Sequence, residues 1–268
     1  MYFRPDLLKG KTAFITGGGT GIGFEMARGL GQVGAKVIIA SRSQNKLEPA
    51  TSRLRDMGID VHWKLLNIHD PDAVFKVVDE IIEEHQSIDV LVANAGGQFP
   101  AKAEDITPNG WKTVIDLNLN GTFYCCSAVG RHMIKRGGGG KILNMSASFI
   151  DRGSGGIMHR GATCAAISQM TRTLAVEWAQ FNIQVNAIGP QYLSSGLFNC
   201  FGAAGSIDSS FPKVSLAGRW ATGDEIGAWA VILCSSLSDY VTGTTLYLDG
   251  GAWLQDGINV RGTPVCPE

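Results

Sequence analysis

A glycine-rich turn near the start of the chain has residue types and spacing that suit phosphate binding. Residues 16–23 read TGGGTGIG, between an apolar run that predicts a strand, Thr12–Thr16, and an amphipathic stretch that predicts a helix, Ile22–Val33. Glycines let a phosphate approach the backbone closely, and the first turn of a helix offers free N–H groups at the positive end of its dipole. The turn therefore predicts a site for the pyrophosphate of a dinucleotide.

The second apolar run carries information about the ribose of that dinucleotide. It ends in Ser41-Arg42-Ser43, with no Asp or Glu at the point where a carboxylate usually holds the ribose 2′-hydroxyl of NAD. A hydroxyl and a guanidinium suit a 2′-phosphate instead. We therefore expect the cofactor to be NADP(H) rather than NAD.

Composition excludes several other kinds of protein. The 268 residues carry a formal net charge of −1, which offers no broad basic surface for nucleic acid. No apolar stretch is long enough to span a membrane, and the first residues do not read as a secretory signal. The six cysteines and five histidines show no metal-ligand spacing, so we expect no metal site and free thiols in a reducing compartment.

Short apolar runs alternate with amphipathic segments along the whole chain, and this pattern predicts the fold. Strands followed by helices of this length pair in parallel and carry helices on both faces of the sheet. The sequence thus predicts a single α/β domain over residues 1–268, a Rossmann-like doubly wound sheet of about seven strands. The predicted strands are Thr12–Thr16, Lys36–Ser41, Val61–Leu66, Val90–Asn94, Lys141–Met145, Gln184–Ile188 and Thr245–Leu248. Predicted helices include Ile22–Val33, Pro71–His85, Gly110–Lys135 and Ala162–Phe181.

One segment lacks any periodicity. Residues 189–213 are rich in Gly, Ser and Phe, and their length predicts a substrate loop or lid rather than a simple connection.

With these features in view, the chain resembles the short-chain dehydrogenase/reductase family over essentially its whole length. The motifs that carry the resemblance are the turn at 16–23, Asn94-Ala95-Gly96, the segment 116–121 with Asn118, Val185-Asn186-Ala187 before Pro190, and Asp249-Gly250-Gly251. The resemblance implies that Asn67 and Ile68 flank the adenine, and that Pro190, Leu193 and Ser195 approach the nicotinamide. Gln191 stands where the family usually has a glycine after that proline. The turn, the second strand and the resemblance together predict a cofactor site made of Gly17, Thr20, Gly21, Ile22, Gly23, Ser41, Arg42, Asn67, Ile68, Asn94, Ala95, Gly96, Pro190, Leu193 and Ser195.

Within the family, the chain is most similar to the peroxisomal trans-2-enoyl-CoA and 2,4-dienoyl-CoA reductases. The matching segments are residues 4–8, 96–99, 118–124, 174–178 and 249–254. The chain ends in Val265-Cys266-Pro267-Glu268 rather than an SKL-like tripeptide, so we expect a cytoplasmic rather than a peroxisomal location.

The catalytic residues of the family are replaced. Most members use a Ser, a Tyr and a Lys, the last two spaced YxxxK, but this chain has Ala147, Arg160 and Cys164 at those positions and keeps only Asn118. An arginine stays protonated in proteins and cannot act as a proton donor. Ordinary carbonyl reduction must protonate an alkoxide, and this chain lacks the tyrosine that usually donates the proton. Hydride delivery to an already electrophilic carbon depends mainly on positioning and is less affected.

Besides Asn118, three nearby groups are candidates for catalysis. Arg160 could hold a carbonyl or carboxylate, His159 could shuttle protons, and Asp151 could stabilise a cation. Structural roles remain as alternatives: His159 as a structural or surface imidazole, and Asp151 with Arg152 as a solvated turn. Likewise, Cys164 could be inert packing and Arg42 a solvated surface charge.

These observations leave several functions open. The leading hypothesis is an NADPH-dependent oxidoreductase that reduces an activated C=C or C=N (iminium) bond of a small-molecule substrate, recruited to specialised biosynthesis such as the fungal indole-alkaloid pathways whose reductase guides a Diels–Alder cyclisation. The alternatives are an enoyl- or dienoyl-CoA reductase, a cofactor-scaffolded cyclase or isomerase, and a non-catalytic NADP(H)-binding protein. The resemblance further implies a homodimer or homotetramer.

Overall fold

A computed structural model describes residues 3–191 and 215–254 of the chain. Their core is a parallel sheet of seven strands in the order β3-β2-β1-β4-β5-β6-β7. The strands are β1 (Thr12–Thr16), β2 (Lys36–Ser41), β3 (Val61–Leu65), β4 (Val90–Ala93), β5 (Gly140–Met145), β6 (Ile183–Pro190) and β7 (Thr245–Leu248). The predicted Rossmann-like architecture is confirmed, and each predicted strand lies within two residues of its observed bounds.

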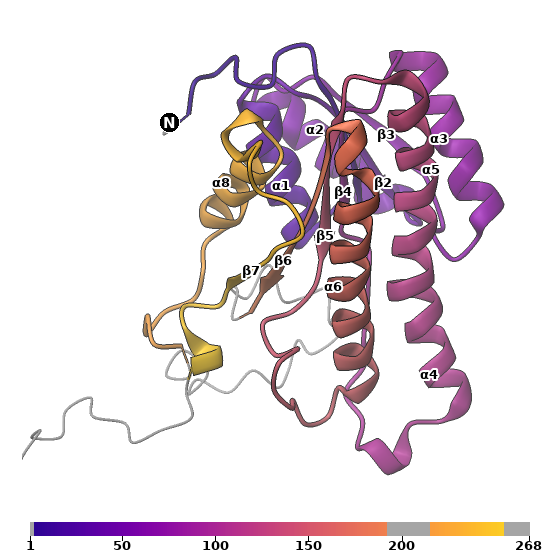
Figure 1. Ribbon diagram of the computed structural model, residues 1–268, viewed down its shortest axis with the longest axis vertical. Coiled ribbons are helices and arrows are strands. Elements are labelled where there is room, and N and C mark those ends of the chain that lie inside the picture. Colours follow the sequence, from indigo (N-terminus) through magenta and orange to yellow (C-terminus); the bar gives the residue numbers. More distant parts are fainter. Residues whose placement is uncertain (1–2, 192–214, 255–268) are drawn as a thin grey trace, which may run out of the picture.

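Helices cover both faces of this sheet (Figure 1). The helices are α1 (Gly21–Gln32), α2 (Gln44–Asp56), α3 (Pro71–His85), α4 (Pro108–Ile115), α5 (Gly121–Arg136), α6 (Met158–Trp178) and α8 (Gly223–Leu233). Short helical turns add η1 (Ala103–Asp105), η2 (Asp116–Asn120), η3 (Ala179–Phe181), η6 (Ser236–Ser238) and η7 (Ala252–Leu254).

The two faces form two separate apolar cores because successive strand side chains point to opposite sides. On β1, Ile15 joins the core built with α1, α2 and α8, whereas Phe14 joins the core built with α3, α5 and α6. On β2, Ile39 and Ile38 divide in the same way. All four side chains are fully buried, as expected for strands covered on both faces.

The predicted helix Gly110–Lys135 is wrong as a single regular element. It is divided into α4 and α5 by η2, a π-helical turn over Asp116–Asn120. The extra residue of a π turn cannot be seen in a periodic pattern, and such turns are often found at functional sites. Here the turn carries Asn118, whose side chain is buried.

The strand order reverses beside β1, because β2 lies on one side of it and β4 on the other. In open α/β sheets, this reversal opens a crevice at the carboxyl ends of the strands, where ligands bind. The predicted glycine turn follows β1 directly and therefore lies at this crevice.

Most of the predicted substrate loop 189–213 lies outside the described residues. Among the described helices, none is both long and apolar enough to cross a bilayer.

Candidate functional site

The glycine turn after β1 is held closely against the segment after β4. Gly17 has a φ of +69°, and a Cβ added to it would lie 2.7 Å from Asn94 Nδ2. The Asn94 amide donates to the carbonyl oxygens of Thr16 (2.9 Å) and Gly17 (3.3 Å), and the Thr16 hydroxyl accepts from the backbone N–H groups of Asn94 and Ala95, both at 3.0 Å. A Cβ on Gly23 would collide with the Gly17 carbonyl oxygen. Only glycine fits at these two positions, and the backbone is left bare toward the crevice.

The helix that begins at this turn has an N-terminus suited to an anion. Thr20 is the N-cap of α1, but its hydroxyl makes no capping hydrogen bond, and the first turn of α1 contains no acidic residue. The first N–H groups of a helix have no partner within it, and together with the dipole they attract negative charge. The N-terminus of α1 can therefore accept a phosphate.

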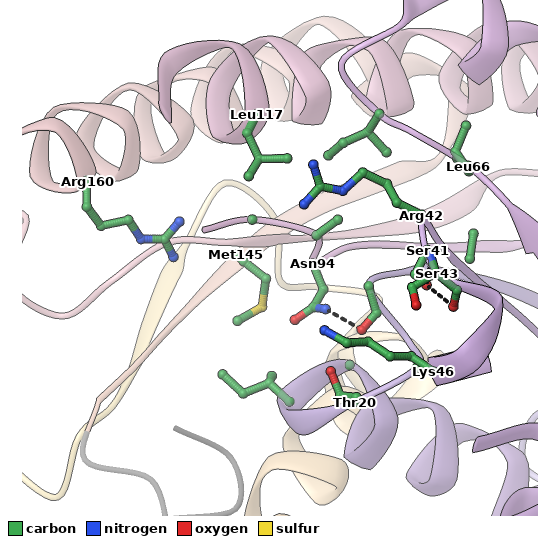
Figure 2. A pocket seen from close by; sticks show the side chains of 18 residues that line it. Thr20, Ser41, Arg42, Ser43, Lys46, Leu66, Asn94, Leu117, Met145 and Arg160 are labelled. Carbon is green, nitrogen blue, oxygen red and sulfur yellow. Dashed lines mark hydrogen bonds between the residues drawn. The ribbon is translucent and has the colours of Figure 1, made fainter. Parts of the chain in front are cut away.

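A cavity of about 250 Å³ opens over this turn and runs along the carboxyl ends of the strands (Figure 2). Three of its lining side chains are cationic, and none of those in the described part of the chain is a carboxylate. The lining residues are Gly17, Gly19, Thr20, Ile22, Gly23, Ala40, Ser41, Arg42, Ser43, Lys46, Leu66, Ile68, Asn94, Ala95, Gly96, Leu117, Met145 and Arg160.

Two of the three cations start from the side of the cavity where Ser41 and Ser43 lie, and their charged ends reach toward its middle (Figure 2). Arg42 follows β2, and Lys46 lies four residues further on, in the first turn of α2. Within residues 3–191 and 215–254, neither side chain is paired with a carboxylate. Lys46 was not predicted as a site residue. A second cation four residues after Arg42, at the start of the helix that follows β2, could have indicated it.

The third cation, Arg160, lies at the opposite end from Ser41, Ser43 and Lys46 (Figure 2). A Cβ added to Gly96 would lie 3.3 Å from Arg160 Nη1 and 3.0 Å from Asn118 Oδ1. The guanidinium therefore approaches the bare backbone of the Asn94-Ala95-Gly96 motif. No described residue forms a salt bridge or a side-chain hydrogen bond with it.

Asn118 is 1% exposed, and its polar atoms are bound within the protein. Its Oδ1 accepts from the Gly97 N–H at 2.8 Å, and its Nδ2 donates to the Gly97 carbonyl oxygen at 2.9 Å and to Thr163 Oγ1 at 3.4 Å. The side chain thus fixes the loop that bears Gly96, beside the Arg160 guanidinium.

His159 is also enclosed. Its ring is 0% exposed, packs edge-on against Phe99 with centroids 4.5 Å apart, and accepts the Arg160 N–H at Nδ1. Its Nε2 has no partner among the described residues. The ring therefore anchors the first turn of α6 next to Arg160.

Asp151 lies outside the cavity lining, in the loop between β5 and α6. It accepts a hydrogen bond from the Tyr247 hydroxyl on β7, a contact between distant parts of the sequence. Burial raises the pKa of Tyr247 to about 12, and the bond to Asp151 adds to this effect. Tyr247 packs in turn against Trp253, with ring centroids 5.6 Å apart. The phenol stays neutral and holds the carboxylate in place.

The positions of the family's serine and lysine hold apolar or inert groups. Ala147 and Cys164 are both buried and pack together with Phe149. Burial raises the pKa of the Cys164 thiol, so it stays protonated near neutral pH and is not a nucleophile. It also lacks the positive charge of the lysine that it replaces.

Three predicted cofactor residues do not line the cavity. Gly21 is the first residue of α1, Pro190 ends β6, and Asn67 is exposed with its side chain bonded to the His69 N–H. Leu193 and Ser195 lie outside the described residues. The described residues contain no group of three or more His, Cys, Asp or Glu side chains that could hold a metal ion.

The arrangement can bind an elongated, multiply phosphorylated ligand. Bare glycine backbone and an uncapped helix suit a pyrophosphate, while Arg42 and Lys46 suit a further phosphate toward one end. Arg160 then marks the opposite end, where an oxygen atom of a second molecule can be bound.

Known proteins resemble this chain in sequence and fold. A family model described as enoyl-(acyl carrier protein) reductase matches residues 17–252. The chain is 38% identical to the peroxisomal 2,4-dienoyl-CoA reductase of Pongo abelii, over 97% of this chain and 89% of that protein.

Solved structures agree with this assignment. A gluconate 5-dehydrogenase from Burkholderia cenocepacia, in complex with NADP and tartrate, has a TM-score of 0.86 and 34% identity, covering 94% of this chain and 98% of its own. A short-chain dehydrogenase from Bacillus anthracis has a TM-score of 0.87 and 36% identity, covering 94% and 99%. This chain belongs to the short-chain dehydrogenase/reductase family of oxidoreductases.

Proposed function

We propose that the protein is an NADPH-dependent reductase of an activated C=C or C=N bond in a small molecule. The observation that carries the proposal is the cavity itself, which joins a glycine turn and the cations Arg42 and Lys46 to a third cation, Arg160, that has no carboxylate partner among the described residues. NADPH supplies the hydride when bound. The side chains bind the cofactor, orient the substrate and stabilise the charge that develops on it.

The described residues fit a phosphorylated dinucleotide. The backbone around Gly17 and the N-terminus of α1 would hold the pyrophosphate, and Arg42 with Lys46 would hold the 2′-phosphate. NADP in the similar Burkholderia gluconate 5-dehydrogenase supports this choice of cofactor.

The residues near Arg160 favour an activated double bond over a carbonyl group. Reduction of a ketone leaves an alkoxide, which must be protonated, and the family's usual donor is replaced by a residue that stays charged. Hydride addition to an activated carbon needs a positioned acceptor and a stabilised charge, which Arg160 can provide. The name of the dienoyl-CoA relative supports a C=C substrate, including enoyl or dienoyl thioesters.

We assign different roles to the four predicted catalytic residues. Arg160 touches the substrate, while Asn118 and His159 position it, the first through the loop bearing Gly96 and the second through the first turn of α6. A proton shuttle needs a path to water, which the buried His159 ring lacks. Asp151, held by Tyr247, is placed to attract a cationic group outside the cavity.

The proposal is tested by isotope transfer. NADPH deuterated at C4 is incubated with the protein and a panel of enoyl thioesters, enones and cyclic iminium ions, and products are analysed by mass spectrometry. We expect one deuterium in at least one product. Absence of label from every compound in the panel contradicts the proposal.

A reaction without net reduction, such as cyclisation or isomerisation, is the second candidate. The feature that favours it is Asp151, a carboxylate outside the cofactor cavity that pairs with no cation in the described ranges and could attract a cationic part of a substrate that extends beyond the cavity. This candidate predicts turnover with NADP⁺ and unchanged absorbance at 340 nm. It fails if the product always gains two hydrogens.

We also propose that the protein is a homo-oligomer. Helix α6 exposes the apolar side chains of Met158, Ala162, Ala165 and Val176, the last 79% exposed, beside polar residues such as Gln169 and Glu177. A second copy of the chain would cover these apolar side chains. Light scattering on purified protein should give a dimer or tetramer mass.

The buried free cysteines of the described part fit our proposed cytoplasmic location.

A further inference from the structure

We propose that the substrate is an α,β-unsaturated carbonyl compound whose carbonyl oxygen is bound by Arg160, and that the proton which completes the reduction comes from water. This inference rests on the proposed reductase function and chooses between its two substrate classes, conjugated carbonyls and iminium ions.

The placement of Arg160 is the first argument. Its guanidinium enters the cavity beside Gly96, where an added Cβ would lie 3.3 Å from Nη1, and no described group neutralises its charge. Asn118 and His159 both brace this corner of the site, through Gly97 and through the Arg160 N–H respectively. A cation with free N–H donors is suited to an oxygen atom that gains negative charge.

Charge is the second argument. The cavity lining contains Arg42, Lys46 and Arg160 and, among the described residues, no carboxylate. An iminium ion would meet an unpaired positive charge on entering, and hydride addition to it leaves a neutral amine that gains nothing from a guanidinium. A conjugated carbonyl is neutral on entry and becomes anionic as it reacts, so Arg160 binds its transition state more strongly than its ground state.

The chemistry balances with water as the only further reactant. With NADPH bound, its hydride would add to the β-carbon, the electrons of the C=C bond would form an enolate, and Arg160 would bind the enolate oxygen. A proton from water then adds to the α-carbon, which restores the carbonyl group and leaves hydroxide. The substrate gains two electrons and two hydrogens, and the cofactor is oxidised to NADP⁺.

The side chains at the positions of the family's acid explain why water is needed. Arg160 cannot release a proton near neutral pH, and the Cys164 thiol is buried with a raised pKa. Hydride transfer and protonation are therefore separate events. The rate of hydride transfer should not fall as the pH rises from about 6 to 9, because an arginine stays protonated over this range.

The test is single-turnover kinetics at 340 nm with the NADPH complex, using crotonyl-CoA, a cyclic enone and N-methylpyrrolinium. Arg160→Leu should slow reduction of the conjugated carbonyls by about 100- to 1,000-fold, as loss of one oxyanion donor does elsewhere. Arg160→Lys should recover part of this loss. Arg172→Leu is the matched control, because Arg172 lies on the same helix, is exposed and, among the described residues, forms a side-chain hydrogen bond with Gln169 alone. In D₂O, the product should carry solvent deuterium at the α-carbon.

Binding of NADPH, measured separately by fluorescence, distinguishes failure of the substrate assignment from failure of the proposed reductase function. If NADPH binds and only the iminium ion is reduced, or if Arg160→Leu leaves carbonyl reduction unchanged, the inference is overturned and the proposed reductase stands. If neither class is reduced, both are overturned. A rate of hydride transfer that falls as a group with a pKa below 9 loses its proton also contradicts the inference.

Discussion

The preference for NADPH over NADH should depend on Arg42 and Lys46 together. Both side chains are exposed, line the cavity and lack a carboxylate partner in the described part of the chain. Hydrogen bonds to charged groups contribute about 1.5–3 kcal/mol, and exposure places each of these toward the lower value. The double variant Arg42→Ala/Lys46→Ala should therefore lose about 3 kcal/mol, or roughly 100-fold in NADPH affinity.

Fluorescence titration of both cofactors checks this value. NADH lacks the 2′-phosphate, so its affinity should change by less than about threefold, within ordinary context effects of about 0.6 kcal/mol. Raising the salt concentration should weaken NADPH binding to the wild type more than to the double variant, because exposed charges are screened. Lys135→Ala, a surface substitution on α5 that also removes one positive charge, is the control. The reasoning is refuted if the NADH-to-NADPH ratio of dissociation constants is unchanged in the double variant.

Three further predictions concern the site and the stability of the fold. Gly23→Ala should abolish dinucleotide binding, because the added Cβ would collide with the Gly17 carbonyl oxygen, and calorimetry would show the loss. Asn118→Ala should lower the free energy of unfolding by about 1–3 kcal/mol in urea titrations, because it leaves buried polar groups unpaired; unchanged stability would contradict this. Burial and the neighbouring His62 lower the pKa of His85, so stability is full above the unfolded value of about 6.5 and falls as the pH drops through the folded pKa. His85→Gln should flatten this dependence in urea titrations between pH 7.5 and 5; an unchanged slope would show that other groups cause it.

Most of the fold could be predicted because its sequence patterns are strongly periodic and local. Buried parallel strands such as β2 read as unbroken apolar runs, and the end of each was marked by glycine or polar residues. The division of Gly110–Lys135 could not be predicted, because the periodic pattern does not show the extra residue of the π turn or the bonds that its Asn118 makes with the distant Gly97.

The site was predicted where the chemistry resides in a contiguous motif. The glycine turn and Arg42 were visible in this way, whereas the link from Asp151 to Tyr247 joins residues 96 positions apart. The buried position of His159 likewise depends on its packing against Phe99. Tertiary contacts of this kind leave no periodic signal, so the sequence offered the right residues without their partners.

Calorimetric titration of the purified protein with NADPH, NADP⁺ and NADH is the decisive measurement. We expect one saturable site per chain for each phosphorylated nucleotide, with NADPH bound more tightly than NADH and with binding weakened by salt. Failure of both phosphorylated nucleotides to associate with the protein would contradict it.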